Sequence, residues 1–302
     1  MNVRIGTRGS KLALWQAHRV RDLLEEEGFS IELKLYKTTG DIRTDKALHN
    51  LGERGLFTKA LDDALLNDEV DIAVHSSKDV PSMIPEDLEL IAFMKREDPR
   101  DVLVAVDESV DLDNLSKPIV VGTSSLRRQS QLNHYVPHCE VKVIRGNVDT
   151  RVSKLESGEY DALILAYAGV KRMGYQSLVR RKLNVNTFTP AVGQGAIGIM
   201  ARRGRSDLDG VRSVLNHRIT EIAVLAERSF LRTLQGGCHT PIFALATVTG
   251  DSLSLQGGMG AVDGSVVLRE SIEGHAAQAE ELGEHLANSL LSNKAATEIL
   301  NG

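Results

Sequence analysis

The chain has 302 residues, enough for two or three domains, with 25% charged residues, 42% hydrophobic residues and a formal net charge of −5. This composition is typical of a soluble globular protein, and the acidic balance disfavours a broad nucleic-acid-binding surface. No apolar run approaches the roughly 20 residues of a membrane helix, and the charged N-terminus does not resemble a secretory signal. Two cysteines, Cys139 and Cys238, are too few for a disulfide framework and favour the reducing cytoplasm.

Short β-rich runs alternate with amphipathic helical stretches over the first two-thirds of the chain. A strand at 3–5 leads into a helix from its N-cap Ser10 to about Glu27, where Gly28 ends it. Further strands are predicted at 31–35, 70–74, 101–106, 119–121, 141–144 and 162–165, with helices at 57–68 and from about 125 and 148. This alternation predicts parallel sheets covered by helices on both faces, with the ligand-binding loops along one rim.

The last third of the chain predicts a smaller α+β unit. A helix at about 219–234 precedes three short strands, and Gly250-Asp251 and Asp263-Gly264 are hairpin turn signals. The strands are expected near 242–248, 253–257 and 266–270, and a final helix at about 276–291. We therefore expect an antiparallel sheet here.

The segment 122–128, Gly-Thr-Ser-Ser-Leu-Arg-Arg, runs from a strand through a small polar turn into a helix. Free backbone N–H groups and the helix dipole favour an anion at such a turn, and arginines suit carboxylate or phosphate. The alternative is an ordinary N-cap followed by a solvated basic helix face. Segment 145–151 and the pair Lys171-Arg172 also follow strands, and residues 122–172 carry a net charge of +3 in an acidic chain. Three cationic strand ends suggest a site for a polyanion.

Two segments of the N-terminal half are further candidates. Segment 7–10, Thr-Arg-Gly-Ser, follows the first strand and opens a helix, although an isolated arginine there is usually a surface residue. Segment 75–81, His-Ser-Ser-Lys-Asp-Val-Pro, follows a strand and presents Asp79, which could act as a general acid or base or stabilise a cation. The alternative is an aspartate satisfied by Lys78 or by backbone donors. No second ligand at helical or strand spacing supports a metal site at His75.

Cys238 lies in a Gly-Gly-Cys-His-Thr-Pro loop between a predicted helix and a predicted strand. The glycines permit unusual backbone angles and leave the sulfur accessible, which suggests a reactive or covalently modified thiol. The local sequence alone favours a small buried residue. Cys139 has no such surroundings and is expected to be a packing residue.

Taken together, these segments resemble the porphobilinogen deaminase (hydroxymethylbilane synthase) family. The resemblance covers nearly the whole chain in order, and it also includes Gly55-Leu56-Phe57, segment 96–101 (Arg-Glu-Asp-Pro-Arg-Asp) and segment 190–196 (Pro-Ala-Val-Gly-Gln-Gly-Ala). The chain departs from the family pattern at Ser77, where methionine or leucine is commoner. It also departs at Arg54 and Asn50, where lysines are common.

The resemblance implies two α/β domains similar to type II periplasmic binding proteins and a smaller α+β domain with an antiparallel sheet. The expected boundaries are 1–95 with 196–214, 100–190, and 218–302. It also implies a cytoplasmic monomer without metal, nucleic-acid or membrane partners. The expected activity is deamination and joining of four porphobilinogen molecules into the linear tetrapyrrole hydroxymethylbilane, primed by a dipyrromethane cofactor on Cys238.

By resemblance, Asp79 is the catalytic residue, assisted by Lys78 and Arg8. Each pyrrole carries an acetate and a propionate, which would account for the many arginines. Residues implied in cofactor binding are Ser10, Ser76, Lys78, Asp79, Thr123, Ser124, Ser125, Arg127, Arg128, Arg145, Gly146 and Cys238; those implied in substrate binding are Arg8, Arg145, Arg151, Arg172 and Gln194.

Two alternatives come from other classes of protein. The first is a two-lobed anionic-solute-binding or sensor protein without catalysis, which usually carries an export signal or a DNA-binding helix-turn-helix. The second is a phosphate-handling enzyme, but the chain has no Gly-x-x-x-x-Gly-Lys-Ser/Thr loop and no obvious pair of carboxylates for magnesium.

Overall fold

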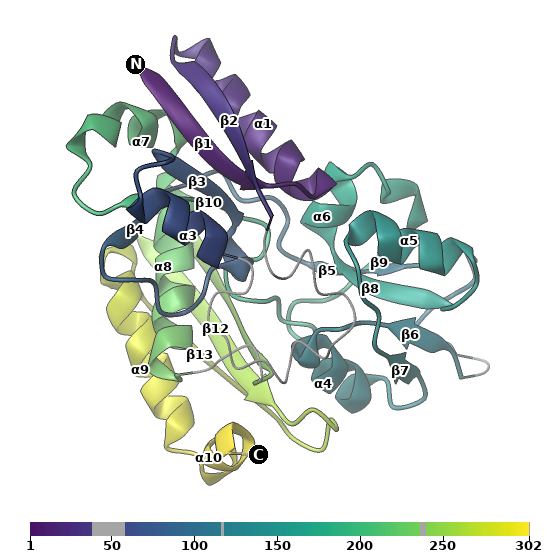
Figure 1. Ribbon diagram of the computed structural model, residues 1–302. Helices are drawn as coiled ribbons and strands as arrows, with labels where there is room; N and C mark the ends of the chain where they lie inside the picture. Colours follow the sequence, from purple (N-terminus) through teal and green to yellow (C-terminus); the bar gives the residue numbers. More distant parts are fainter. Residues whose placement is uncertain (38–57, 116–117, 236–239, 302) are drawn as a thin grey trace. The chain divides into compact units, whose positions relative to one another are not determined.

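The computed structural model describes residues 1–37, 58–115, 118–235 and 240–301 (Figure 1). The chain divides into two compact units, which are described separately below. The first contains Met1–Glu97 and Gly195–Glu221, and the second contains Asp98–Gln194 and Ile222–Gly302. No helix within the described ranges is long and apolar enough to cross a membrane.

The first unit is built on a five-stranded sheet in the order β2-β1-β3-β10-β4. Strands β1 and β2 are parallel, as are β1 and β3, whereas β10 is antiparallel to both of its neighbours. The strands are β1 (Asn2–Arg8), β2 (Ser30–Tyr36), β3 (Ile72–Ser76), β4 (Leu88–Phe93) and β10 (Ile197–Arg202); the helices are α1 (Lys11–Glu26), α3 (Lys59–Leu66) and α7 (Asp209–Leu215).

The predicted start and end of α1 are confirmed. The Ser10 side chain accepts a hydrogen bond from the Ala13 N–H at 3.4 Å, and Gly28 adopts a left-handed φ of 82° just beyond the helix. Val20 and Leu24 of this helix are fully buried against Ile5 and Ile72 of the sheet. Local capping and an apolar helix face therefore place the first helix.

The second unit contains a five-stranded sheet in the order β7-β6-β8-β5-β9. Strand β6 is parallel to β7 and to β8, whereas β5 is antiparallel to β8 and to β9. The strands are β5 (Asp101–Val104), β6 (Val120–Gly122), β7 (Glu140–Lys142), β8 (Ala162–Ala166) and β9 (Val179–Lys182); the helices are α4 (Leu126–Tyr135), α5 (Val148–Glu156) and α6 (Tyr167–Arg172).

The expectation of parallel sheets describes most of the strands, but each five-stranded sheet also contains one reversed strand. Strand β10 runs against β3 in the first sheet, and β5 runs against β8 in the second. Each reversed strand is entered by a chain segment that arrives from the other unit instead of through a helical crossover. It therefore begins at the sheet edge where its parallel neighbours end.

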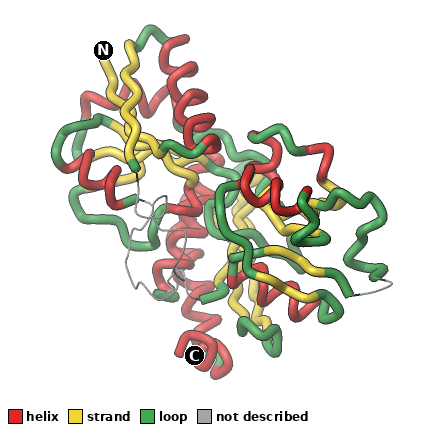
Figure 2. The backbone as a smooth tube through the Cα atoms, turned by 45° about the vertical axis from the view of Figure 1, so that its right-hand side comes forward, coloured by secondary structure: helices red, strands yellow, loops and turns green. Residues whose placement is uncertain are grey.

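The predicted antiparallel sheet at the C-terminus is confirmed, in the order β11-β12-β13. Glycines with positive φ, Gly250 and Gly264, occupy its two turns. Phe230 is fully buried in its core, and Phe243 of β11 is fully buried outside that cluster. The elements are β11 (Ile242–Thr249), β12 (Ser252–Gly260), β13 (Val267–His275), α8 (Arg218–Thr233), α9 (Ala279–Leu291) and α10 (Lys294–Asn301), and Figure 2 shows the last two helices near the C-terminus. The expected fold class, α/β units with a smaller α+β part, is thus confirmed.

Close packing of α8 against α9 gives a test of this core. A Cβ at Gly283 would lie 2.3 Å from the Ala226 carbonyl oxygen and 2.8 Å from Ser229 Cβ. We expect Gly283→Ala to lower the free energy of unfolding by about 1–3 kcal/mol, because crowding outweighs the better helix propensity of alanine. Urea unfolding measures the change, and Glu284→Ala at the exposed neighbouring position is the control. Equal stability of the two variants would contradict the packing described.

Candidate active site

The carboxyl ends of β1 and β3 form the candidate edge of the first unit. These parallel strands pair with Ile5 opposite Ile72 and Gly6 opposite Ala73, so the segments that follow them leave the sheet side by side. Gln16 of α1 donates from Nε2 to Ser76 Oγ at 2.8 Å, which ties the first helix to the end of β3. The predicted site residues Arg8, Ser10, Ser76, Lys78 and Asp79 are thereby gathered at one edge.

Asp79 closes a 3-10 turn, Ser77–Asp79, directly after β3. The Ser77 N–H donates to the Ala196 carbonyl at 3.0 Å, and the Val80 N–H donates to the Ser77 carbonyl at 3.3 Å. Ser77 is buried, whereas Lys78 and Asp79 are exposed. The backbone of the turn is therefore anchored from the sheet side while its two charged side chains reach solvent. A carboxylate held in this way is available to a ligand.

His75 is part of the interior of the first unit. Its side chain is buried, and its Nε2 has no hydrogen-bond partner among the described residues. Burial lowers the pKa of His75 to about 4, with a smaller contribution from the positive charge of Arg8. The imidazole is therefore neutral near pH 7.

The candidate edge of the second unit is where the parallel strands β6, β7 and β8 end. The Thr123 N–H donates to the Lys142 carbonyl at 2.9 Å, and Thr123 Oγ1 accepts from the Ser125 N–H at 3.2 Å. Ser125 is the N-cap of α4, yet its side chain makes no capping hydrogen bond. The turn 123–125 is thus fixed through its backbone, while the Ser124 and Ser125 side chains remain half-buried.

The segment after β7 depends on one glycine. Gly146 has a φ of 110°, and a Cβ there would lie 2.7 Å from Thr150 Cγ2, so other residues would be strained. Arg151 donates from Nε to the Gly146 carbonyl at 2.7 Å. Arg145 precedes this turn and Arg172 ends α6 after β8; both side chains are half-buried. The cationic segments after β6 and β7 therefore begin at one sheet edge, whereas Arg172 lies at the far end of the helix that follows β8.

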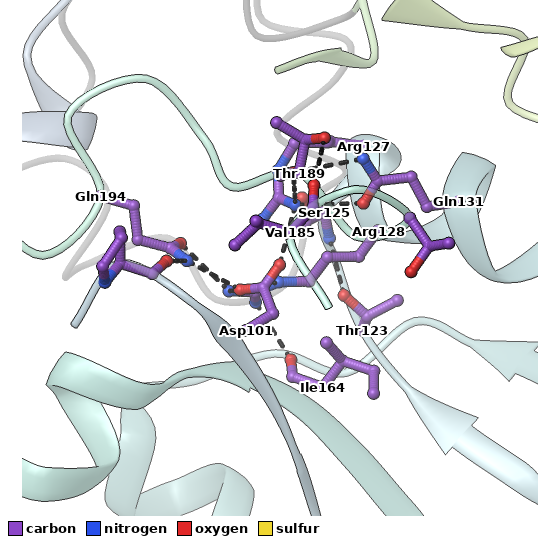
Figure 3. A network of polar contacts seen from close by, with 12 residues as sticks. Asp101, Thr123, Ser125, Arg127, Arg128, Gln131, Ile164, Val185, Thr189 and Gln194 are labelled. Atoms are coloured by element: carbon purple, nitrogen blue, oxygen red, sulfur yellow. Dashed lines mark hydrogen bonds and ion pairs between the residues drawn. The ribbon is translucent and has the colours of Figure 1, made fainter. Parts of the chain in front are cut away.

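Arg127 and Arg128 do not form a solvated basic helix face. Each is only 5% exposed, and both guanidinium groups converge on the fully buried carboxylate of Asp101 (Figure 3). Arg127 Nη1 lies 2.8 Å from Asp101 Oδ2, and Arg128 Nη2 lies 2.7 Å from Oδ1. The predicted site residue Gln194 is also buried here and donates from Nε2 to Asp101 Oδ1 at 2.9 Å.

Sequence reasoning did not identify Asp101 as part of the site. A purely parallel sheet would place the first residue of β5 at the edge away from ligands. Because β5 is antiparallel to β8, Asp101 lies opposite Ala166, the last residue of β8. The sequence offered one signal, which is that Asp101 stands between Pro99-Arg100 and an apolar strand. Placing Asp101 at the site required the direction of that strand, which the sequence does not give.

Several expected features lie outside the described residues. These are Cys238 with its glycine loop, and the segment that contains Asn50 and Arg54. The described Cys139 is a half-buried free thiol whose pKa is raised by burial, in keeping with a packing residue.

The charges of the second unit fit an organic polyanion such as dipyrromethane, whose pyrrole rings carry carboxylates. Arg127 and Arg128 share one carboxylate, which leaves one positive charge in excess. Arg127 Nε is buried without a hydrogen-bond partner among the described residues. Arg145 and Arg151 add cations in the segment after β7, and Arg172 adds one at the end of α6. Fold and charge together define an α/β protein with strand-end sites suited to a ligand rich in carboxylates.

Comparison with known proteins gives the family. A family model described as porphobilinogen deaminase, dipyromethane cofactor binding domain, matches residues 3–210, and one for the C-terminal domain of the same enzyme matches residues 221–292. A porphobilinogen deaminase of Desulfosudis oleivorans is 42% identical over 295 residues, covering 97% of this chain and 95% of that protein. The chain belongs to the porphobilinogen deaminase family.

The similarity to solved structures is lower. The BvgS VFT2 domain of Bordetella pertussis has a TM-score of 0.43 and 16% identity, over 71% of this chain and 85% of that one. An ancestral cationic amino acid solute-binding protein has a TM-score of 0.41 and 15% identity, over 70% of this chain and 87% of that one.

The family assignment confirms the activity expected from the sequence. The chain is a transferase of tetrapyrrole biosynthesis that deaminates porphobilinogen and joins four molecules into hydroxymethylbilane, primed by dipyrromethane. The alternative of a non-catalytic solute-binding or sensor protein is not favoured.

The buried neutral His75 predicts acid sensitivity of the fold. Its pKa is near 6.5 when unfolded and about 4 when folded, so below pH 6.5 the unfolded state binds more protons. The free energy of unfolding should fall by up to about 1.4 kcal/mol per pH unit between pH 6.5 and 4. Urea unfolding at pH 7, 6 and 5 tests this, with His75→Gln expected to show a shallower decline. An equal decline in both proteins would exclude His75 as the source.

Proposed function

We propose that the residues of this chain take two different roles in the reaction. Asp79 stabilises the positively charged nitrogen of the reacting pyrrole and transfers protons, and the arginines bind the acetate and propionate groups. The observation that carries this proposal is the exposed Asp79 carboxylate on a turn whose backbone is fixed to the sheet. A fixed carboxylate can stabilise each cationic centre as it forms, without reorganising for each new substrate.

The chemistry requires charge stabilisation at a defined place. Porphobilinogen loses ammonia and becomes an electrophile with positive charge on the pyrrole nitrogen. Dipyrromethane, when bound, supplies the nucleophilic pyrrole α-carbon that primes the chain. Asp79 pairs with the cationic nitrogen and accepts or donates the proton that each condensation moves. Lys78 and Arg8, at the same edge of β1 and β3, orient the substrate carboxylates.

The arginines would neutralise a product that gains two carboxylates with every pyrrole. Arginine suits this task because its planar guanidinium binds carboxylate through paired hydrogen bonds. Arg145, Arg151 and Arg172 are half-buried, so part of each side chain is accessible to solvent. Proposed cofactor contacts are Ser10, Ser76, Lys78, Asp79, Thr123, Ser124, Ser125, Arg127, Arg128, Arg145 and Gly146; proposed substrate contacts are Arg8, Arg145, Arg151, Arg172 and Gln194.

We also propose that Cys238 holds the dipyrromethane through a thioether bond. The glycine-flanked position of this thiol and the half-buried, packing character of Cys139 both support the assignment. The chain would act as a cytoplasmic monomer of three domains, with boundaries at 1–95 with 196–214, 100–190 and 218–302. The three separate sheets support such a division.

Removing the charge of Asp79 should abolish turnover without unfolding the protein. We expect Asp79→Asn to lower kcat by roughly 100-fold or more, the range for a lost acid–base group, while the covalent adduct is retained. Ammonia release and product formation are measured with porphobilinogen. Asp87→Asn is the matched control, since Asp87 is an exposed aspartate of the same unit. A rate of Asp79→Asn close to wild type would remove Asp79 from its role.

Cys238→Ala should eliminate the covalent adduct, because no other thiol would take its place. Intact mass of freshly purified protein is expected to equal that of the bare polypeptide, and pyrrole-specific aldehyde colour should be lost. Cys139→Ala is the control and should keep both the adduct mass and the colour. An adduct that persists in Cys238→Ala would place the attachment elsewhere.

A further inference from the structure

We propose that Asp101 is a positioning residue for the reaction: its buried carboxylate sets the orientation of the Arg127 and Arg128 guanidinium groups toward the carboxylates of the cofactor and growing chain. This role rests on the proposed function of those two arginines. Asp101 itself carries the wrong charge to bind an anionic ligand, so it acts through its neighbours.

The strand direction places Asp101 under the binding edge. Asp101 is the first residue of β5 and lies opposite Ala166 at the end of β8. The turn 123–125 and the first turn of α4 follow β6, which is parallel to β8. A carboxylate from the reversed strand therefore meets two guanidinium groups from the helix that opens at this edge.

Hydrogen bonds hold one oxygen of the Asp101 carboxylate, and the ion pair with Arg127 holds the other. Oδ1 accepts from Arg128 Nε at 3.1 Å and Nη2 at 2.7 Å, and from Gln194 Nε2 at 2.9 Å. The same Gln194 nitrogen donates to the Pro99 carbonyl at 2.7 Å. Burial by itself would raise the pKa of Asp101, but the charges of Arg127 and Arg128 lower it well below its usual range. The carboxylate is thus ionised and has little freedom to move.

Each of the two guanidinium groups also donates a hydrogen bond to a backbone carbonyl. Arg127 Nη1 donates to the Thr189 carbonyl at 2.7 Å and Arg128 Nη1 to the Ile164 carbonyl at 3.0 Å. Thr189 is in turn contacted by Arg269 of β13, whose Nε lies 3.2 Å from Thr189 Oγ1. Asp101 is the shared anion of this network, and without it two buried cations would repel each other.

A donor on Arg127 without a partner indicates that this network faces a ligand. This guanidinium is only 5% exposed, and its Nε has no hydrogen-bond partner among the described residues. Burying a charged donor without a partner is costly. Asp101 Oδ2, which lies 2.8 Å from Arg127 Nη1, also makes no hydrogen bond among the described residues, so these two groups meet as an ion pair only. The unused Arg127 Nε is the donor that a ligand carboxylate would take.

The chain contains a matched control with the same chemistry. Asp71 of the first unit is also buried, and its carboxylate is shared by Arg4 at 2.9 Å and Arg205 at 3.1 Å. Asp71 directly precedes β3 and Asp79 lies beyond its other end, so the two aspartates are at opposite ends of that strand. Substitutions at Asp71 report the effect of disturbing a buried aspartate between two arginines, without disturbing the proposed site.

The experiment compares Asp101→Asn and Asp101→Glu with Asp71→Asn and Asp71→Glu. The Asn variants remove the charge and are expected to be destabilised at both positions. The Glu variants keep the charge but lengthen the side chain by one methylene, which displaces the guanidinium groups. Adduct occupancy of the folded fraction is measured by intact mass, together with kcat and KM for porphobilinogen.

We expect Asp101→Glu to fold, to lose most of its adduct or to acquire it at least tenfold more slowly, and to lose roughly 10- to 100-fold in kcat/KM, mainly through KM. Asp71→Glu should keep wild-type occupancy and KM. If Asp101→Asn does not fold, Asp101→Glu still decides the question. Wild-type occupancy and KM in Asp101→Glu would overturn the positioning role.

The wild-type protein separates this role from the proposed function. A wild-type protein that stays without an adduct and inert when given porphobilinogen would overturn the proposed function and the role of Asp101 with it. A loaded, active wild type with an unimpaired Asp101→Glu would overturn the positioning role alone.

Discussion

The reversed strand in each five-stranded sheet determines which residues can meet at a ligand edge. A strand that runs against its parallel neighbours brings its first residues to the edge where those neighbours end. In the second unit this places Asp101 below the turn that opens α4; in the first unit β10 brings Ala196 to the backbone of Ser77. The geometry of Asp79 and of the Arg127–Arg128 pair follows from these reversals.

The buried charges of the second unit are consistent with the proposed site for polyanions in a protein of net negative charge. Arginines buried alone would be costly, and arginines balanced completely would have no charge left for a ligand. One aspartate shared between Arg127 and Arg128 balances the positive charge of the pair only in part. It lowers the cost of burying the pair while leaving a net positive charge and a free donor.

His75 shows that a polar residue next to the proposed catalytic turn can belong to the protein interior. His75 precedes the proposed catalytic turn, yet its side chain is buried, and burial keeps it neutral near pH 7. Its neighbours Lys78 and Asp79 reach solvent. Within one short segment, the end of the strand therefore separates a core residue from the exposed acid and base.

The sequence by itself determined most elements, the fold class and the family resemblance, because helix caps, glycine turns and apolar periodicity act over a few residues. The Ser10 cap, the turn at Gly264 and the cationic ends of β6, β7 and β8 are of this kind. Only the tertiary structure decided that β5 and β10 run backwards, that Arg127 and Arg128 are buried, and that Asp101 is their common partner. Those features depend on pairing between strands far apart in the chain, where local propensity carries no information about direction or burial.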